Sequence, residues 1–233
     1  MGAVAELGKW GVSPASSLTA PTEGLGTDRA IPVLAELRDL LPYRGLARGS
    51  TISVAGIGAT SLMFALLAEA TTRGSWAALV ALPGLGLAAA KATGVALERI
   101  AVVPNPGPDT LSVAATLLDG FDLVVVGVHG GITASAASQM SARARKAGSV
   151  LVTLGEWPGA NMTVACRDAR WLSRGRLRCR ELTVRLTGRG GAARPNEKRI
   201  WLPDDPTFRA AHAQREQARR ETAGPVRRLR ALP

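Results

Sequence analysis

The sequence has little that would support metal binding, membrane insertion or export. Its two cysteines, Cys166 and Cys179, match no metal-ligand spacing. No apolar run reaches the ~18 residues that a membrane helix needs. Residues 1–10 hold Glu6 and Lys9 and lack the apolar block of a signal peptide. We therefore expect a protein of the reducing cytoplasm, whose cysteines are buried free thiols rather than a disulfide.

The most informative stretch is 51–62, which lacks the charged residue that its layout would normally contain. Its β-branched run, residues 52–54, is followed by Gly56 and Gly58 and then by a helical apolar pattern that stops at Gly74. A strand, a glycine turn and a helix in this order are typical of a phosphate-binding loop, which cradles phosphates with backbone N–H groups. The layout predicts a nucleotide-binding architecture around which the rest of the chain is organised.

The charge that such a loop requires is missing. A working loop needs a Lys for the β- and γ-phosphates, yet no Lys or Arg lies between Arg48 and Arg73. Thr60 and Ser61 remain where the hydroxyls would lie, and capping the following helix is their simplest role. We therefore expect a degenerate loop with no cofactor, no metal and no catalytic residues.

The basic charge is confined to one part of the chain. The 233 residues, 46% of them apolar, are enough for one good core, and the formal net charge is +11. Residues 1–165 carry 11 basic and 11 acidic side chains, whereas residues 166–233 carry 18 and 7. Lys198 is the single lysine of that second part, and arginine suits phosphate and carboxylate because its planar fork donates in pairs.

Apolar runs alternate with helical patterns over residues 52–154. Strands are predicted at 52–55, 76–82, 100–103, 123–128 and 150–154, and helices at 31–41, 60–73, 85–92, 135–147 and between a capping Asp109 and Gly120. Continuous apolar strands are expected when helices cover both faces of a parallel sheet. The pattern predicts an α/β domain of three layers with a mostly parallel sheet.

After residue 155 the pattern changes. Short strands at 162–166, 182–186 and 200–202 predict an antiparallel extension of the sheet on its C-terminal side. A polar helix is expected at 207–221. The predicted organisation is a flexible arm at 1–28 that includes Trp10, a core domain at 29–205, and a basic Arg-rich helix and tail at 206–233.

The tail has three interpretations. It is a solvated segment without a partner, a nucleic-acid contact acting through phosphates, or a docking element that folds on a protein. We favour docking because apolar anchors stand between the charges. The candidate partner or nucleic-acid residues are Phe208, Arg209, Arg215, Arg219, Arg220, Val226, Arg227, Arg228, Leu229, Arg230 and Leu232.

Isolated polar residues elsewhere offer little chemistry. His129 follows a predicted strand and precedes Gly130, and it is more simply a loop histidine than a relic ligand contact. Asp122 and Glu156 are too isolated to form an acid–base pair. No Ser/His/Asp order points to a compact nucleophilic site.

The order of these elements resembles the core of RecA over roughly residues 40–205. Residues 45–46 correspond to the family's Gly-Leu lead-in, and residues 56–61 correspond to its phosphate loop. The resemblance also implies three further chemical positions. These are a water-activating acid near residues 81–84, a metal-supporting Asp at Gly127 and a γ-phosphate-sensing Gln at Gly155. All four positions lack their chemical group, which implies that hydrolysis is lost.

Within RecA-like proteins the chain is similar to the ImuA-prime family, the ATPase-deficient accessory proteins of the actinobacterial mutasome. The stretch 189–195 and the following 201–203 carry that resemblance. It implies a part in damage-induced (SOS) translesion synthesis beside an inactive Y-family polymerase homologue, ImuB, and an error-prone C-family DNA polymerase. It also implies a cytoplasmic location that becomes nucleoid-associated during DNA damage.

Other functions remain open. One is a RecA-modulating or DNA-binding protein, with RecA or DNA phosphates as partner. Another is a weak nucleotide-binding ATPase, which the absence of a loop Lys disfavours. The third is a SulA-type cell-division inhibitor, for which the basic tail has no evident use.

Overall fold

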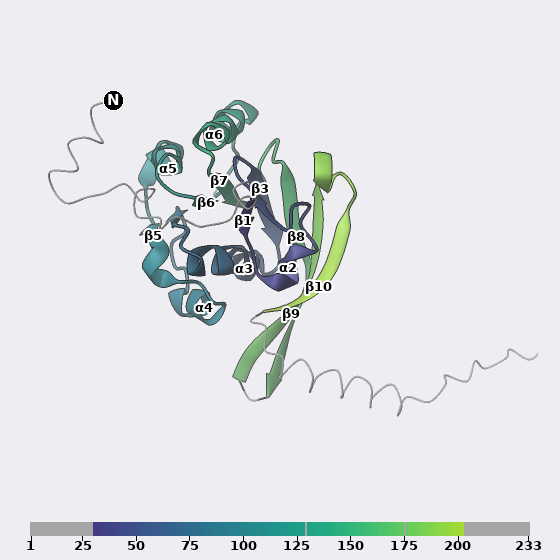
Figure 1. Cartoon of the computed structure of the whole chain (residues 1–233). Helices are drawn as coiled ribbons and strands as arrows, with labels where there is room; N and C mark the ends of the chain where they lie inside the picture. The colour runs from purple at the N-terminus through teal and green to yellow at the C-terminus, as the bar shows by residue number, and fades with distance from the viewer. Residues whose placement is uncertain (1–29, 129, 175, 203–233) are drawn as a thin grey trace, which may run out of the picture.

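The computed structural model describes residues 30–202, apart from residues 129 and 175 and the side chains of 172–178. Eight strands form one sheet in the order β10-β9-β8-β3-β7-β6-β4-β5, and β1 and β2 form a separate pair (Figure 1). The strands are β1 (Ala30–Pro32), β2 (Gly45–Ala47), β3 (Thr51–Gly56), β4 (Ala77–Val80), β5 (Ile100–Val103), β6 (Leu123–Gly127), β7 (Val150–Leu154), β8 (Met162–Arg174), β9 (Arg176–Gly188) and β10 (Asn196–Leu202).

Helices join the parallel strands. They are α2 (Ala35–Arg38), α3 (Ala59–Thr72), α4 (Leu87–Ala92), α5 (Thr110–Leu118) and α6 (Ala134–Ala147), with short 3-10 turns η3 (Leu97–Arg99), η4 (Gly107–Asp109) and η5 (Gly190–Ala192). All pairings from β8 through β5 are parallel, whereas β9 and β10 are antiparallel to their neighbours. The predicted mostly parallel α/β sheet with an antiparallel extension is confirmed.

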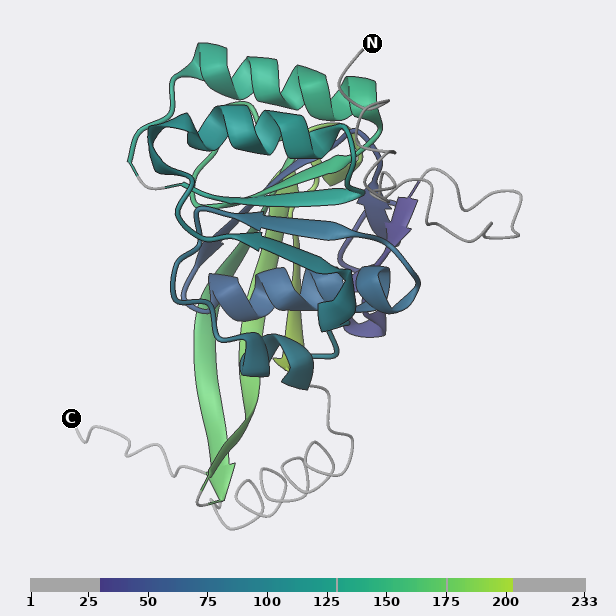
Figure 2. The ribbon, with the colours of Figure 1, turned by 90° about the vertical axis from the view of Figure 1, so that its left-hand side faces the viewer.

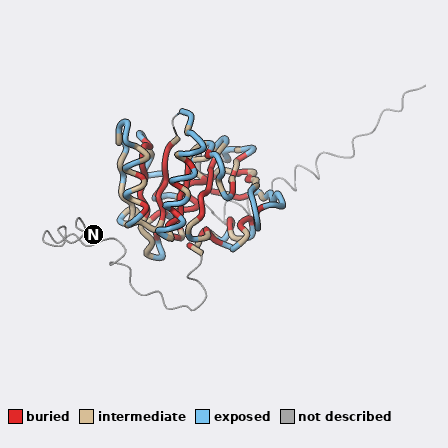
Figure 3. The backbone as a smooth tube through the Cα atoms, turned by 90° about the horizontal axis from the view of Figure 1, so that it is seen from above, coloured by how far each residue is buried: buried red, intermediate tan, exposed pale blue. Residues whose placement is uncertain are grey.

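Helices lie on both faces of the sheet, as expected. In Figure 2, α5 and α6 lie above the sheet and α3 and α4 lie below it. The apolar strand residues divide between two cores: Leu123 and Val125 of β6 pack with α3, whereas Val124 and Val126 pack with α5 and α6. Because successive strand residues point to opposite faces, a strand covered on both sides must be apolar throughout. Figure 3 shows these buried strands between the more exposed helices.

The segment before the first core strand differs from the prediction. A helix was expected at 31–41, but Ile31 lies in β1 opposite Leu46 of β2, and only Ala35–Arg38 is helical. The residue before a proline is disfavoured in the α conformation, and Ile31 precedes Pro32. The apolar residues of this segment, Val33, Leu37, Leu40 and Leu41, are nevertheless buried, because the segment packs against α3.

The antiparallel extension is longer than the sequence predicted. The expected strand 162–166 continues as β8 to Arg174, and β9 pairs with it along a ribbon that projects from the body (Figure 1). β8 pairs with β3 up to Gly56 opposite Cys166, and beyond that point it is held by β9 alone. This antiparallel pairing sustains the strand where the apolar pattern stops, and the register shifts just after Cys166.

Two smaller expectations are also met. Cys166 and Cys179 are free and buried. Within the described part of the chain, no helix is long and apolar enough to cross a bilayer. The predicted arm at 1–28 with Trp10, the helix at 207–221 and His129 lie outside the described residues.

We predict that Leu66→Asp unfolds the domain. Leu66 of α3 is 0% exposed, and burying a lone carboxylate costs several kcal/mol against a total stability of ~5–15 kcal/mol. Leu87→Asp is the matched control, because Leu87 is 42% exposed and begins α4, where an acid suits the helix dipole. Thermal melting followed by circular dichroism should show a cooperative transition for the control only. A cooperatively melting Leu66→Asp protein would show that this helix face is not buried.

Candidate functional site: the carboxyl edge of the parallel strands

The four positions singled out by the sequence meet at one edge of the sheet. The strands β3, β4, β6 and β7 run in parallel, with Val54 opposite Leu154 and Gly127 also opposite Leu154. Their carboxyl ends therefore lie side by side, which is where ligands bind in open α/β sheets. The four positions therefore share one edge of the sheet, and the chemistry of that edge depends on the groups that lie there.

The glycines of the loop serve close packing by the antiparallel extension. Gly56 (φ 87°) and Gly58 (φ 91°) both adopt the left-handed conformation that favours glycine. A Cβ on Gly56 would lie 2.1 Å from the carbonyl oxygen of Cys166 in β8. A Cβ on Gly58 would meet Leu182 of β9 at 3.2 Å. Because neither glycine has a side chain, β8 and β9 can pack closely against the loop.

A cation does lie beside the loop, but it comes from β9. The Arg180 guanidinium carbon would lie 3.1 Å from a Cβ on Gly58, and it stacks over the Trp171 ring at 5.1 Å. Its Nε is buried and has no hydrogen-bond partner among the described residues. Arg180 was not predicted, because the expected cation was one within the loop and its helix, and Arg180 lies on a distant strand. The loop is correctly described as lacking its own Lys, and the guanidinium of a distant strand lies against it.

The hydroxyls of the loop do not cap the helix, contrary to expectation. The N-cap residue of α3 is Gly58, which offers no side chain, and Thr60 and Ser61 lie within the first turn. Thr60 is exposed and Ser61 is half-buried. No hydrogen bond joins either hydroxyl to another described residue. They are therefore polar groups at a helix end whose first N–H groups have no partner within the helix.

The position expected for the water-activating acid and the position expected for the metal-supporting Asp pack against each other. Ala81 follows β4 with φ 55°, and a Cβ on Gly127 would lie 2.2 Å from the Ala81 carbonyl oxygen. Ala81 and the next residue, Leu82, are both buried, and neither carries a polar side chain. The place where a metal-supporting carboxylate would stand is thus occupied by backbone.

The sensor position is also used for packing. Gly155 (φ 126°) follows β7, and a Cβ there would lie 3.1 Å from the Cβ of Val128. Its carbonyl oxygen accepts a hydrogen bond from the Ser53 hydroxyl at 2.8 Å. The adjoining Glu156 is exposed. The end of β7 is therefore tied to β3 rather than open to a ligand.

A cavity of about 350 Å³ lies at this edge beside Gly127, between α5 and the segment after β6. Its described lining is apolar or backbone, with Thr110 the one hydroxyl and no ionisable side chain. Nearby, burial raises the pKa of the Cys166 thiol, while the charge of Arg180 opposes that rise, and the thiol donates to the Asp168 carbonyl oxygen. Over the described residues, no three His, Cys, Asp or Glu side chains gather as a metal site would require.

Residues 39–159 match the model of a family described as the MT3502 N-terminal domain, which is just over half of the chain. The chain belongs to this family. The match runs from the end of α2 past β7 and so includes all four positions at the carboxyl edge.

A relative is found in Mycobacterium tuberculosis. The chain is 46% identical over 112 residues to the uncharacterized protein Rv3395c, an alignment that covers 47% of this chain. The aligned part spans about half the length of that curated relative (55%). The family description and the name of the relative state no activity. The candidate tail residues, from Phe208 to Leu232, lie outside the described residues.

We predict that Gly127→Asp does not create hydrolysis and lowers stability by about 1–3 kcal/mol. The new side chain must displace the Ala81 carbonyl, and overpacking of this kind carries such a cost. Gly131→Asp is the matched control, because no atom lies within 4 Å of a Cβ there. Urea unfolding and phosphate release from ATP measure the two effects. Hydrolysis by Gly127→Asp would contradict the closure of this edge.

Proposed function

We propose that the protein is a non-catalytic accessory factor of damage-induced translesion DNA synthesis. In this proposal a RecA-like body serves as a scaffold that docks on the inactive Y-family polymerase homologue ImuB and assists an error-prone C-family polymerase. The RecA-like interpretation of the fold belongs to the same proposal.

The close packing at the carboxyl edge is the observation that supports the absence of catalysis in this proposal. The Ala81 carbonyl lies against Gly127, and β8 and β9 lie against Gly56 and Gly58. Hydrolysis in RecA-like proteins needs charged groups at these strand ends. Backbone fills the position that a side chain at Gly127 would take, and the cavity beside it has no ionisable side chain among its described lining residues, so the architecture supports a scaffold role.

The element order supports the RecA-like part. The degenerate loop begins at the end of β3, and the three other chemical positions lie just after β4, at the last residue of β6 and just after β7 of the same parallel sheet. The mutasome part draws on the resemblance of residues 189–195 and 201–203. Those of them that the structure describes lie around η5 and at the end of β10, on the antiparallel extension, and residue 203 lies outside the described residues.

A second candidate function is nucleotide binding without hydrolysis, and Arg180 is the observation that favours it. Its guanidinium lies beside the first turn of α3, where free N–H groups and the helix dipole attract anions. We rank it second because Arg180 packs directly against Gly58, in the space that a phosphate needs to reach the loop.

We predict no binding of magnesium-ATP in the low micromolar range by titration calorimetry. The loop has no Lys of its own, and Arg180 and Leu182 lie over Gly58. A low micromolar Kd that Arg180→Ala abolishes would establish the second candidate instead. A heat signal that survives that substitution would contradict both interpretations of the loop.

We predict that Leu229→Ala with Leu232→Ala weakens co-purification of the full chain with ImuB at all salt concentrations. Both leucines are apolar anchors in the basic tail, and truncated anchors typically cost more than 1 kcal/mol of binding. Truncation after Pro206 should abolish binding and leave the melting temperature nearly unchanged. Arg227→Ala with Arg228→Ala is the control for charge, and its effect should fade as salt rises. Full affinity of the truncated chain would place the interface on the described body.

A further inference from the structure

A groove lined by three arginines lies at the opposite, amino-terminal edge of the parallel strands. It joins a cavity of about 360 Å³ to one of about 280 Å³, and both are lined by Arg145, Asn161 and Arg189. Arg48 and Tyr43 line the larger cavity. We call these five residues and the two cavities the amino-edge groove.

Close backbone approaches build the walls of the groove. Gly49 (φ 76°) precedes β3, and a Cβ there would lie 3.1 Å from the Cα of Arg145 near the end of α6. Gly191 of η5 packs against Pro42, since a Cβ there would lie 2.9 Å from the proline Cβ. The groove draws its residues from four segments that are far apart in the sequence, and close packing of the backbone holds them together.

Asn161 joins the two cavities and offers a free donor. Its side-chain oxygen accepts from the Thr51 N–H at 2.8 Å, and its carbonyl oxygen accepts from the Arg189 N–H at 3.0 Å. Its side-chain nitrogen has no hydrogen-bond partner among the described residues. An amide nitrogen is a donor only, so the groove presents it to an acceptor.

The positive charge of the groove is largely uncompensated. None of its described lining residues is acidic. Arg145 and Arg189 are exposed and form no ion pair with any described residue. Arg48 is paired with Asp122 at 3.0 Å. The groove thus holds two free guanidinium groups and one that is partly neutralised.

Two acids of the body, Asp39 and Asp119, are paired with cations outside the groove. Asp39 bonds to Lys198 at 3.3 Å and to Arg44 at 2.9 Å, and the Lys198 hydrogen bond, followed by the charges of Lys198 and Arg44, holds the pKa of Asp39 below its usual value. Asp119 is paired with Arg143. Neither of these two carboxylates lines the groove.

Tyr43 supplies an aromatic surface at the rim. It is 62% exposed, although it lies between the buried Leu41 and Gly45. An exposed aromatic ring beside unpaired arginines is the combination with which proteins hold single-stranded nucleic acid, where bases stack on rings and cations follow the phosphates. An acidic peptide would need the arginines but would have no use for the ring.

We propose that the amino-edge groove binds single-stranded DNA, with phosphates on Arg145 and Arg189 and a base stacked on Tyr43. The inference goes beyond the proposed function, whose stated partners on this chain are proteins bound through the tail. It stands whether or not the protein docks on a polymerase homologue. The occupant is an extended strand, because the two adjoining cavities share three residues and continue past Asn161.

The test measures binding of the full chain to fluorescein-labelled oligo-dT of 20 nucleotides by fluorescence anisotropy over a range of salt. Arg145→Gln with Arg189→Gln should raise the Kd by about tenfold or more. The slope of log affinity against log salt should fall in magnitude by about 1.4, which is ~0.7 for each phosphate contact on a single strand.

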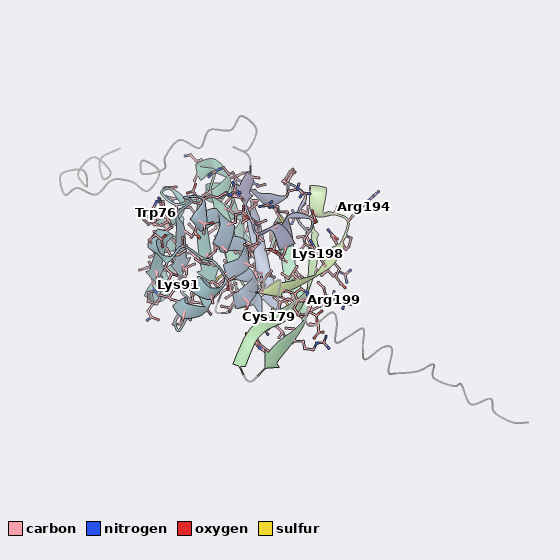
Figure 4. The ribbon with its side chains drawn as sticks, turned by 60° about the horizontal axis from the view of Figure 1, so that its bottom comes forward. Trp76, Lys91, Cys179, Arg194, Lys198 and Arg199 are labelled. Carbon is pink, nitrogen blue, oxygen red and sulfur yellow. The ribbon has the colours of Figure 1, made fainter. Side chains whose placement is uncertain are left out.

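The matched control removes the same charge from neighbouring positions outside the groove. Lys146→Gln with Arg194→Gln changes exposed residues that do not line the two cavities, and Figure 4 shows Arg194 pointing outward at the turn before β10. This double variant should stay within about threefold of the unchanged chain, since only long-range attraction is reduced. Equal losses in the two double variants would overturn the proposal.

Tyr43 separates nucleic acid from an acidic protein. Tyr43→Ala should weaken binding of oligo-dT by about fivefold or more, while Tyr43→Phe should keep it, because stacking needs the ring and not the hydroxyl. Neither change should affect an abasic strand of equal length. A poly-glutamate peptide that binds as tightly as DNA, with no effect of Tyr43→Ala, would assign the groove to an acidic protein and overturn the proposal.

Crosslinking gives a readout that binding by the basic tail cannot mimic. Oligo-dT carrying 5-iodouracil should, on irradiation, attach to the peptide that contains Tyr43, and mass spectrometry should identify it. Loss of that adduct in Arg145→Gln with Arg189→Gln would support the groove. Adducts confined to residues 206–233 would overturn it.

Discussion

The packing of β8 against β3 determines what the rest of this structure can do. β3 is hydrogen-bonded on both sides, to β7 and to β8, and its last residue, Gly56, lies under the Cys166 carbonyl. Because no side chain fits at Gly56, the loop after β3 is fixed by contact with the antiparallel extension. The same approach brings Arg180 and Leu182 over Gly58. A loop that would cradle phosphates in an open sheet is here a packing surface.

This packing also determines where two charged side chains lie. A guanidinium beside a helix N-terminus is disfavoured by the helix dipole, yet Arg180 lies there because it stacks on Trp171 and fills the space above Gly58. At the other edge, Arg145 lies in the last turn of α6, where the dipole stabilises a cation. Its backbone meets Gly49, so the position of its side chain at the groove is set by the sheet.

The sequence predicted best those elements whose stability comes from burial. The run at 150–154 became β7 without change, because an apolar stretch between two helix-covered faces has one stable conformation. The run at 100–103 also became a strand, β5, although it lies at the edge of the sheet and is only half-buried. β8 was underestimated because beyond Cys166 its pairing with β9, rather than a continuous apolar pattern, sustains the strand. The helix expected at 31–41 is shorter in the structure because Ile31 precedes Pro32, which disfavours the α conformation at Ile31. The prediction gave more weight to the apolar pattern than to this local effect.

The candidate sites depended on contacts that no local pattern contains. The edge positions were found because Gly127 lies near the end of the predicted strand 123–128 and Gly155 directly follows the predicted strand 150–154, and parallel strands bring such positions together. Arg180 was missed because 121 residues separate it from Gly58 and only strand pairing brings them together. The groove arginines come from three segments with no shared period, so their convergence is visible only in the fold.

The boundary of the family match illustrates why the extension belongs to the same folding unit. The match ends at residue 159, before β8, yet β8 forms a parallel ladder with β3 over Ile52 to Gly56. Removing the segment after residue 159 would leave the backbone groups of β3 unpaired on one side and would take Val164 and Leu182 out of the larger core. It would also remove Asn161 and Arg189 from the amino-edge groove and Arg180 from the loop. Arg180 at the loop and Asn161 and Arg189 at the groove therefore lie outside the matched region, and a functional comparison restricted to residues 39–159 would omit them.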